Sequence, residues 1–174
     1  MTLDGFCNHT AVIADDELHE NANELFRNAD TVIFGRVTYQ LMESGWPPLV
    51  KKPSGEKAMD EFAVLIDDIS KIVFSHTLKT VEWKNSTLVK GDLKEEVLKL
   101  KKQPGKNILV GGPSLIDELM TLGLIDEYQL CVQPIVLGKG LNLFKNISDR
   151  KDLKLIRTKV FRSGAVLLCY EPVK

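Results

Sequence analysis

The sequence has few cysteines, no strong charge bias and no recognisable metal motif. Its three cysteines are odd in number and widely spaced, which argues against a disulfide framework and against a C-x-x-C metal or redox site; they are Cys7, Cys131 and Cys169. The three histidines show no zinc-binding pattern, so we predict no metal. With 23 Lys and Arg against 24 Asp and Glu, the net charge of −1 gives no electrostatic reason to expect a nucleic-acid or membrane partner.

Long apolar runs are also absent. No run approaches the length of a transmembrane helix, and the amino terminus lacks the basic start and apolar region of a signal peptide, so we predict a cytoplasmic protein. A chain of 174 residues with 44% apolar residues can bury one sizeable core. We therefore expect a single domain over residues 1–174.

The stretch Lys106–Phe144 predicts a strand, a glycine turn, a helix and a second strand. The short apolar run 108–110 is typical of a buried strand, and it stops at Gly111 and Gly112. Apolar residues then recur at helical spacing over 114–122, before Gly123, which suits the position just past a helix end. The run 130–137 is apolar and β-branched, as expected of a strand.

A glycine turn that opens into a helix can bind an anion, because free N–H groups and the positive end of the helix dipole face the ligand. Gly111 and Gly112 could therefore receive a phosphate, or they could simply turn the chain. The motif is not the G-x-G-x-x-G dinucleotide fingerprint, since Pro113 and Ser114 follow and Pro113 has no N–H.

A second unit of the same kind precedes it. The run 30–35 predicts a buried strand that ends at Gly35, and 36–43 predicts a short helix. Arg36 and Thr38 at the start of this helix could hold a phosphate through charge-assisted hydrogen bonds. The alternative is an exposed arginine beside a first-turn threonine.

The remaining pattern alternates helices and strands. Asp15 or Asp16 can cap a helix reaching residue 29, and Asp92 with Glu95 forms an acidic capping box for another. We also expect a helix over 56–69, strands over 71–75 and 86–90, and a hairpin of 153–162 with 165–171. The proline-rich segment 44–55 predicts an ordered loop, in which Trp46 could line a pocket or pin the loop.

These elements predict a three-layer α/β/α fold with a mostly parallel central sheet and a C-terminal antiparallel hairpin. In such sheets ligands bind outside the carboxyl ends of the strands. The turns at Gly35, Ser75 and Gly111 all follow predicted strands. Their convergence favours a ligand that carries phosphate.

Six segments, taken together and in this order along the whole chain, form a recognisable pattern: residues 3–6, 35–39, 110–115, 123–127, 134–140 and 143–144. In these segments the chain resembles the RibD C-terminal family, which is the reductase domain of the bifunctional riboflavin-biosynthesis deaminase/reductase and belongs to the dihydrofolate reductase-like superfamily.

The resemblance implies an NADPH-dependent reductase that transfers a hydride to a pyrimidine- or pteridine-like small molecule and that forms a homodimer. It implies a cofactor site made of Gly35, Arg36, Thr38, Ser75, His76, Gly111, Gly112, Ser114 and Leu115. It places Asp4 and Gly5, and by our pocket hypothesis Trp46, beside the substrate. It also leads us to expect a cis peptide between Gly111 and Gly112. Asp4 is the candidate to polarise or protonate the substrate, and the alternative is an aspartate that caps a turn.

Two departures from the family pattern leave alternatives open. The family has a strand before residues 3–5, so a central strand could be missing here. No acid aligns with the folate-binding position, which disfavours folate reduction. The alternative functions are a stand-alone reductase of another heterocycle or carbonyl compound, and a dinucleotide-binding protein without turnover.

Overall fold

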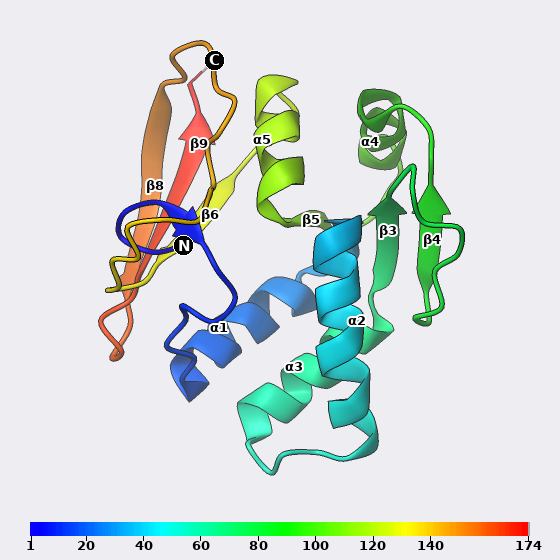
Figure 1. Cartoon of the computed structure of the whole chain (residues 1–174), viewed down its shortest axis with the longest axis vertical. Coiled ribbons are helices and arrows are strands. Elements are labelled where there is room, and N and C mark those ends of the chain that lie inside the picture. Colours follow the sequence, from blue (N-terminus) through cyan, green and yellow to red (C-terminus); the bar gives the residue numbers. More distant parts are fainter. Residues whose placement is uncertain (174) are drawn as a thin grey trace.

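Four parallel strands form the centre of the structure, a computed structural model that describes residues 1–173. Their order across the sheet is β4-β3-β2-β5, with β2 (Ala29–Gly35), β3 (Ser70–Phe74), β4 (Ser86–Val89) and β5 (Asn107–Gly111). The register pairs Gly35 with Phe74 and Phe34 with Gly111. The carboxyl ends of these strands therefore meet at one edge of the sheet (Figure 1).

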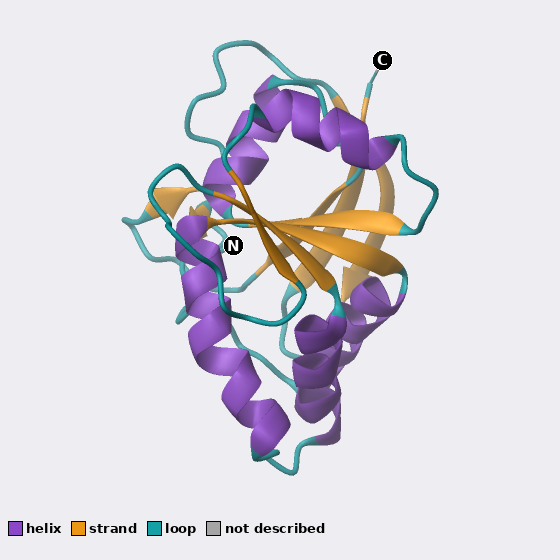
Figure 2. Ribbon diagram, turned by 90° about the vertical axis from the view of Figure 1, so that its right-hand side faces the viewer, coloured by secondary structure: helices purple, strands orange, loops and turns teal. Residues whose placement is uncertain are grey.

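Helices cover both faces of this sheet, as Figure 2 shows. They are α1 (Asp16–Arg27), α2 (Arg36–Lys51), α3 (Lys57–Asp68), α4 (Leu93–Lys101) and α5 (Pro113–Thr121). Alternate residues of β2 face opposite layers: Val32 and Phe34 pack with Phe62 of α3, whereas Ile33 packs with Leu115 and Leu119 of α5. This double burial explains why the strands read as continuous apolar runs.

A second, antiparallel sheet has the order β6-β9-β8, with β6 (Tyr128–Val132), β8 (Leu153–Val160) and β9 (Val166–Pro172). Gly164 takes φ +84° in the turn between β8 and β9, where the Phe161 N–H donates to the Ala165 carbonyl at 2.9 Å. A short ribbon pairs β1 (Phe6–Cys7) with β7 (Leu141–Asn142). The predicted α/β architecture with a parallel sheet and a C-terminal hairpin is confirmed.

Both predicted acidic helix caps are present. The Asp15 carboxylate accepts from the Leu18 N–H at 2.8 Å, and the Asp92 carboxylate accepts from the Glu95 N–H at 2.9 Å. Each bond satisfies a backbone donor that the first turn of a helix leaves unpaired. These two helices thus begin where the sequence predicts.

The predicted loop over 44–55 is wrong for most of its length, because α2 continues through Pro47 and Pro48 to Lys51. Each proline removes a helical N–H, but the ladder resumes at once, since the Lys52 N–H donates to the Pro48 carbonyl at 3.0 Å. Trp46 packs edge-on against Phe62 with ring centroids 4.6 Å apart. Packing of α2 on α3 therefore overrides the local proline signal.

Two further expectations need correction. The strand predicted over 130–137 is shorter and shifted, since β6 ends at Val132 and Pro134 cannot donate to a ladder. The expected cis peptide between Gly111 and Gly112 is wrong: residues 1–173 contain no cis peptide bond. Gly112 turns the chain with φ +108° instead.

None of the helices within residues 1–173 combines the length and the apolar character needed to cross a membrane.

Candidate functional site

The carboxyl ends of β2 and β5 lie side by side, and each leads into a helix. β2 ends at Gly35, which is the N-cap of α2, and β5 ends at Gly111, after which Gly112 is the N-cap of α5. We call this region the strand-end site and define it by Gly35, Arg36, Thr38, Gly111, Gly112 and Ser114. The structure thus brings together the two turns that the sequence singled out as anion-binding.

Close packing requires both glycines of the second turn. A Cβ atom at Gly111 would lie 2.6 Å from the ring of Phe34, and one at Gly112 would collide with Thr38. Gly112 also has φ +108° and ψ 132°, a backbone region that is available to glycine alone. The turn therefore presents bare backbone between β5 and α2.

The two helices at this site differ from the others at their N-termini. α2 and α5 begin at glycine, with no side-chain cap and no acidic residue in the first turn. In contrast, α1 and α4 have aspartate caps and acidic first turns, and α3 has Asp60 in its first turn. The positive ends of α2 and α5 therefore remain available to an external anion.

Side chains at the strand-end site suit the same ligand. Arg36 is exposed, and its guanidinium donates to Gln40 at 3.3 Å, which is long enough to be exchanged for a stronger acceptor. Leu115 is buried in the core beside Ile33, so only its backbone N–H can face a ligand. Since Pro113 has no N–H, the free donors of this turn come from Ser114 and Leu115.

Ser75 and His76 follow β3 at the same edge of the sheet, because Gly35 pairs with Phe74. His76 is exposed. The Ser75 hydroxyl accepts from the N–H groups of Thr77 and Leu78 at 3.2 and 3.1 Å. Ser75 therefore already shapes its own turn, whereas Arg36 is free to move.

Asp4 lies in the amino-terminal segment, where it holds two loops together. Its carboxylate accepts from the Thr2 hydroxyl at 2.6 Å, from the Gly138 N–H at 2.7 Å and from the Leu137 N–H at 3.1 Å. The hydrogen bond from Thr2, followed by the one from Gly138, lowers the pKa of Asp4. An ionised carboxylate can polarise or orient a substrate, but it has no proton to give.

The other two residues predicted beside the substrate lie in different places. Gly5 has φ +88° in the same turn as Asp4, and its carbonyl accepts from Leu143. Trp46 lies ten residues beyond Arg36 in α2, and its indole contacts Phe62 and Met42. Of the two interpretations of Trp46, this placement favours an anchoring role in packing and disfavours a role in lining a pocket.

Sequence reasoning missed three buried polar residues that position the loops near Asp4. Thr2 is fully buried and accepts from the Phe6 N–H, and Gln133 is 2% exposed and accepts from the Ile13 N–H. Asp117 of α5 binds the backbone of residues 145 and 146. The one signal in the sequence was a polar residue inside an apolar helix pattern, at Asp117.

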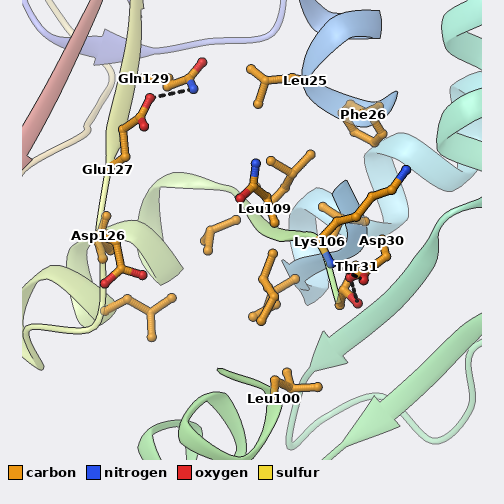
Figure 3. Close-up of a pocket in the computed structure, with 18 of the residues that line it drawn as sticks. Leu25, Phe26, Asp30, Thr31, Leu100, Lys106, Leu109, Asp126, Glu127 and Gln129 are labelled. Carbon is orange, nitrogen blue, oxygen red and sulfur yellow. Dashed lines mark hydrogen bonds between the residues drawn. The ribbon is translucent and has the colours of Figure 1, made fainter. Parts of the chain in front are cut away.

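A cavity of about 690 Å³ lies beside β5 rather than at the strand-end site (Figure 3). Its walls come from α1, α3, α4, α5, β2, β5 and β6; most of the lining side chains are apolar, and charged residues such as Lys106 and Asp126 also line it. We call it the interstrand groove. Of the predicted site residues it includes Gly111 alone.

Within residues 1–173, no group of three or more His, Cys, Asp or Glu side chains is placed to hold a metal ion.

Comparison with known proteins gives a consistent family match. The family model for the RibD C-terminal domain matches residues 1–168. YyaP of Bacillus subtilis (strain 168), described as uncharacterized, is 34% identical over 176 residues, which span 98% of this chain and 90% of YyaP. YwjB of the same organism, also described as uncharacterized, is 28% identical over 146 residues, which span 83% of this chain and 75% of YwjB.

Solved structures share the fold at lower identity. A protein from Shewanella sp. PV-4 with a provisional role in riboflavin biosynthesis aligns with a TM-score of 0.76 and 21% identity, over 100% of this chain and 96% of that one. The Thermotoga maritima diaminohydroxyphosphoribosylaminopyrimidine deaminase/5-amino-6-(5-phosphoribosylamino)uracil reductase aligns with a TM-score of 0.65 and 20% identity. That alignment covers 99% of this chain and 54% of the Thermotoga chain.

Proposed function

Because the chain belongs to the RibD C-terminal domain family, we propose that it is an NADPH-dependent reductase that transfers a hydride to a pyrimidine- or pteridine-like small molecule. One observation carries the proposal. Two neighbouring helices, α2 and α5, begin without side-chain caps beside a glycine turn that a Cβ atom would block. Such a place suits the phosphates of a dinucleotide.

The residues present fit that cofactor. The N–H groups of Ser114 and Leu115 at the glycine turn would hold the pyrophosphate, and Arg36 and Thr38 would hold a phosphate from α2. Ser75 and His76 would lie toward the adenosine end. When bound, NADPH supplies the hydride. The protein then has to bind, orient and shield the reactants.

On the substrate side, Asp4 would act through its negative charge. Its lowered pKa keeps it ionised at neutral pH, and its hydrogen bonds to Leu137 and Gly138 hold the adjoining loop in place. In this proposal Asp4 orients or polarises the substrate, and the proton comes from another donor. Gly5, with φ +88°, keeps the backbone of this turn free of a side chain.

Two further parts of the proposal concern the setting of the enzyme. We place it in the cytoplasm, and we propose that it forms a homodimer. β8 supports the homodimer, because it is an outer strand that carries the exposed apolar residues Leu155, Ile156 and Val160. Pairing two such edges would bury them.

A second candidate is a dinucleotide-binding protein without turnover. It is favoured by the hydrogen bonds of Asp4, which occupy the one carboxylate predicted beside the substrate. A reductase of another heterocycle or carbonyl compound would share the same cofactor site. Substrate turnover, not cofactor binding, distinguishes these candidates.

Calorimetric titration with NADPH and, separately, NADH tests the proposal. We expect saturable binding that favours NADPH, and Arg36→Ala should weaken it by about 1.5–3 kcal/mol, or roughly 10- to 150-fold, if Arg36 binds a phosphate. Arg150→Ala is the matched control, because Arg150 is an exposed arginine paired with Asp152. Failure of the folded wild-type protein to bind either nucleotide would refute the proposal.

A turnover screen completes the test. NADPH oxidation would be followed with ribosylamino-pyrimidines first and other heterocycles and carbonyl compounds next. Oxidation that depends on one of these substrates supports the reductase. NADPH binding without oxidation across the panel supports the protein without turnover.

A further inference from the structure

Asp117 is a buried carboxylate in α5. Leu115 and Leu119 of this helix pack against Ile33 of the parallel sheet. A step of two residues turns a helix by about 200°, so Asp117 faces away from that contact. It is nevertheless only 5% exposed. Burying a carboxylate is costly unless hydrogen bonds replace the lost water, so the partners of Asp117 indicate its role.

The loop after β7 supplies those partners. The N–H groups of Lys145 and Asn146 each donate to Oδ1 of Asp117 at 3.1 Å, and the Asn146 side-chain amide donates to Oδ2 at 2.6 Å. Burial raises the pKa of Asp117, but the bonds from Asn146 and Lys145 outweigh it and lower the pKa. The carboxylate is therefore ionised and held at both oxygens, which ties α5 to this loop.

The same loop is joined to the turn of Asp4 and Gly5, which we call the Asp4 turn. β7 lies just before the loop and pairs with β1, which begins two residues after Asp4. The Leu143 N–H donates to the Gly5 carbonyl at 3.2 Å, and Leu143 is buried. A continuous connection therefore runs from Asp117 through residues 143–146 to the Asp4 turn.

The first turn of α5 belongs to the strand-end site. Ser114 and Leu115, whose N–H groups would hold the pyrophosphate, lie within three residues of Asp117 in the same helix. Backbone hydrogen bonds join successive turns of a helix, so these residues move together. Asp117 thus connects the two sides of the proposed active site, the phosphate donors of α5 and the carboxylate of Asp4.

We propose that Asp117 is a positioning residue, which fixes the Asp4 turn relative to the N-terminus of α5. A cofactor held by its phosphates on α5 would then present its nicotinamide to a substrate oriented by Asp4. Hydride transfer requires such alignment, since a misplacement of about 1 Å can cost roughly 100-fold in rate. This inference rests on the proposed function and adds to it a residue that sets the geometry of the site.

A purely structural clamp would behave differently. Its loss would lower stability and leave the parts of the nucleotide bound in their usual proportion. Loss of a positioning residue weakens the contribution of the nicotinamide, because that end must reach the Asp4 turn, while binding through the phosphates persists. A comparison of NADPH with 2′-phospho-ADP-ribose separates the two cases, because the second nucleotide has the same phosphates and lacks the nicotinamide ring.

The test uses the wild type, Asp117→Asn and Asn146→Ala, with Glu118→Gln as the matched control. Asp117→Asn keeps the volume and places an amide group against the loop donors. Asn146→Ala removes one bond from the loop side, at an exposed residue where the fold tolerates change. Glu118 is the next residue of α5 and is exposed, so Glu118→Gln removes the same charge from the same helix.

Calorimetry gives the affinity of each protein for both nucleotides, and hydrogen exchange gives the protection of the Leu143 amide without nucleotide. We expect Asp117→Asn to weaken NADPH binding by about fivefold or more and 2′-phospho-ADP-ribose binding by less than about twofold. Exchange at Leu143 should speed up by about tenfold. Asn146→Ala should give smaller changes in the same direction, and Glu118→Gln should alter neither the ratio of the two affinities nor the exchange.

Equal changes in the two affinities would overturn the proposal, and so would wild-type exchange at Leu143 in folded Asp117→Asn. The same loss from Glu118→Gln would assign the effect to charge instead of to the tether. If the wild type binds neither nucleotide, the proposed function fails and the positioning role fails with it. If the wild type binds both and Asp117→Asn leaves their ratio unchanged, the positioning role alone is refuted.

Discussion

At the amino ends of β3 and β4 the ammonium group of Lys71 is fully buried, whereas at the carboxyl ends of β2 and β5 two helices begin without a cap. The Lys71 ammonium donates to the carbonyls of Asp67 and Ile69, both at 2.9 Å, and of Lys84 at 3.1 Å. The ring of Trp83 lies 4.4 Å from it. The protein itself therefore satisfies this charge.

The surroundings of Lys71 form a connected network. The Asp67 carboxylate accepts from the Trp83 indole at 2.6 Å and pairs with Lys84 at 2.8 Å. Burial alone would raise the pKa of Asp67, but the bonds from Lys84 and Trp83 outweigh it and lower the pKa. We call Asp67, Lys71, Trp83 and Lys84 the amino-end network.

The difference between the two ends indicates which polar groups serve the fold and which await a ligand. In the amino-end network the buried donors have protein acceptors, as stability requires. At the strand-end site, the first turns of α2 and α5 offer N–H groups with no side-chain partner. Changes at the first end should therefore alter stability alone, and changes at the second should alter cofactor binding.

The largest expected effect is the loss of Lys71. Lys71→Ala should lower the free energy of unfolding by about 3–5 kcal/mol, because it leaves three buried carbonyls without a donor and opens a cavity. Lys71→Met also leaves these carbonyls without a donor, but it retains the volume and creates no large cavity, so it should cost less than Lys71→Ala. Urea denaturation measures the first effect, and calorimetry should show unchanged NADPH affinity in Lys71→Met. If Lys71→Met lost NADPH affinity, the amino-end network would not serve stability alone.

The same lysine predicts a pH dependence. Burial lowers the pKa of Lys71 from 10.5 to about 8, partly offset by Asp67, while the unfolded chain keeps the ordinary value. Between pH 8 and 10.5 the unfolded state therefore binds more protons, and stability should rise with pH by about 3 kcal/mol.

The comparison with Lys71→Met isolates this effect. Burial raises the pKa of all three cysteine thiols, so they favour unfolding as pH increases over part of the same range. Their contribution cancels when the stability of Lys71→Met is subtracted from that of the wild type at each pH. A difference that stays flat from pH 8 to 10.5 would show that the three carbonyl acceptors hold the folded pKa near its usual value.

These two ends also differ in how far the sequence predicted them. Buried parallel strands ending in glycine are visible as apolar runs, so β2, β5 and the turns at Gly35 and Gly111 could be placed. The extent of α2 could not, because the contact between Trp46 and Phe62 is tertiary. Lys71 gave no signal of burial, since a lysine at a strand start usually faces water. The interstrand groove depends on how two sheets lie, which no local pattern encodes.

At the strand-end site, Gly112→Ala should affect both stability and binding. Alanine held at the Gly112 φ of +108° is strained, which should lower the free energy of unfolding by about 1–3 kcal/mol, and the added Cβ would displace Thr38. We expect NADPH affinity to fall about tenfold or more, since the turn that would receive the pyrophosphate must shift. Gly45→Ala is the matched control, because it lies within α2 with no atom within 4 Å of the new Cβ.

The smallest expected effect concerns Ser75, which lies at the ligand-binding edge but has protein partners. If satisfied groups serve the fold, Ser75→Ala should cost about 0.5–1.5 kcal/mol of stability through the lost bonds to Thr77 and Leu78. NADPH affinity should then change less than threefold, well below the effect expected for Arg36→Ala. A loss as large as that of Arg36→Ala, measured by calorimetry on folded protein, would show that the Ser75 hydroxyl serves both the fold and the ligand, its O–H leaving the Thr77 hydroxyl, 3.3 Å away, to donate to the cofactor.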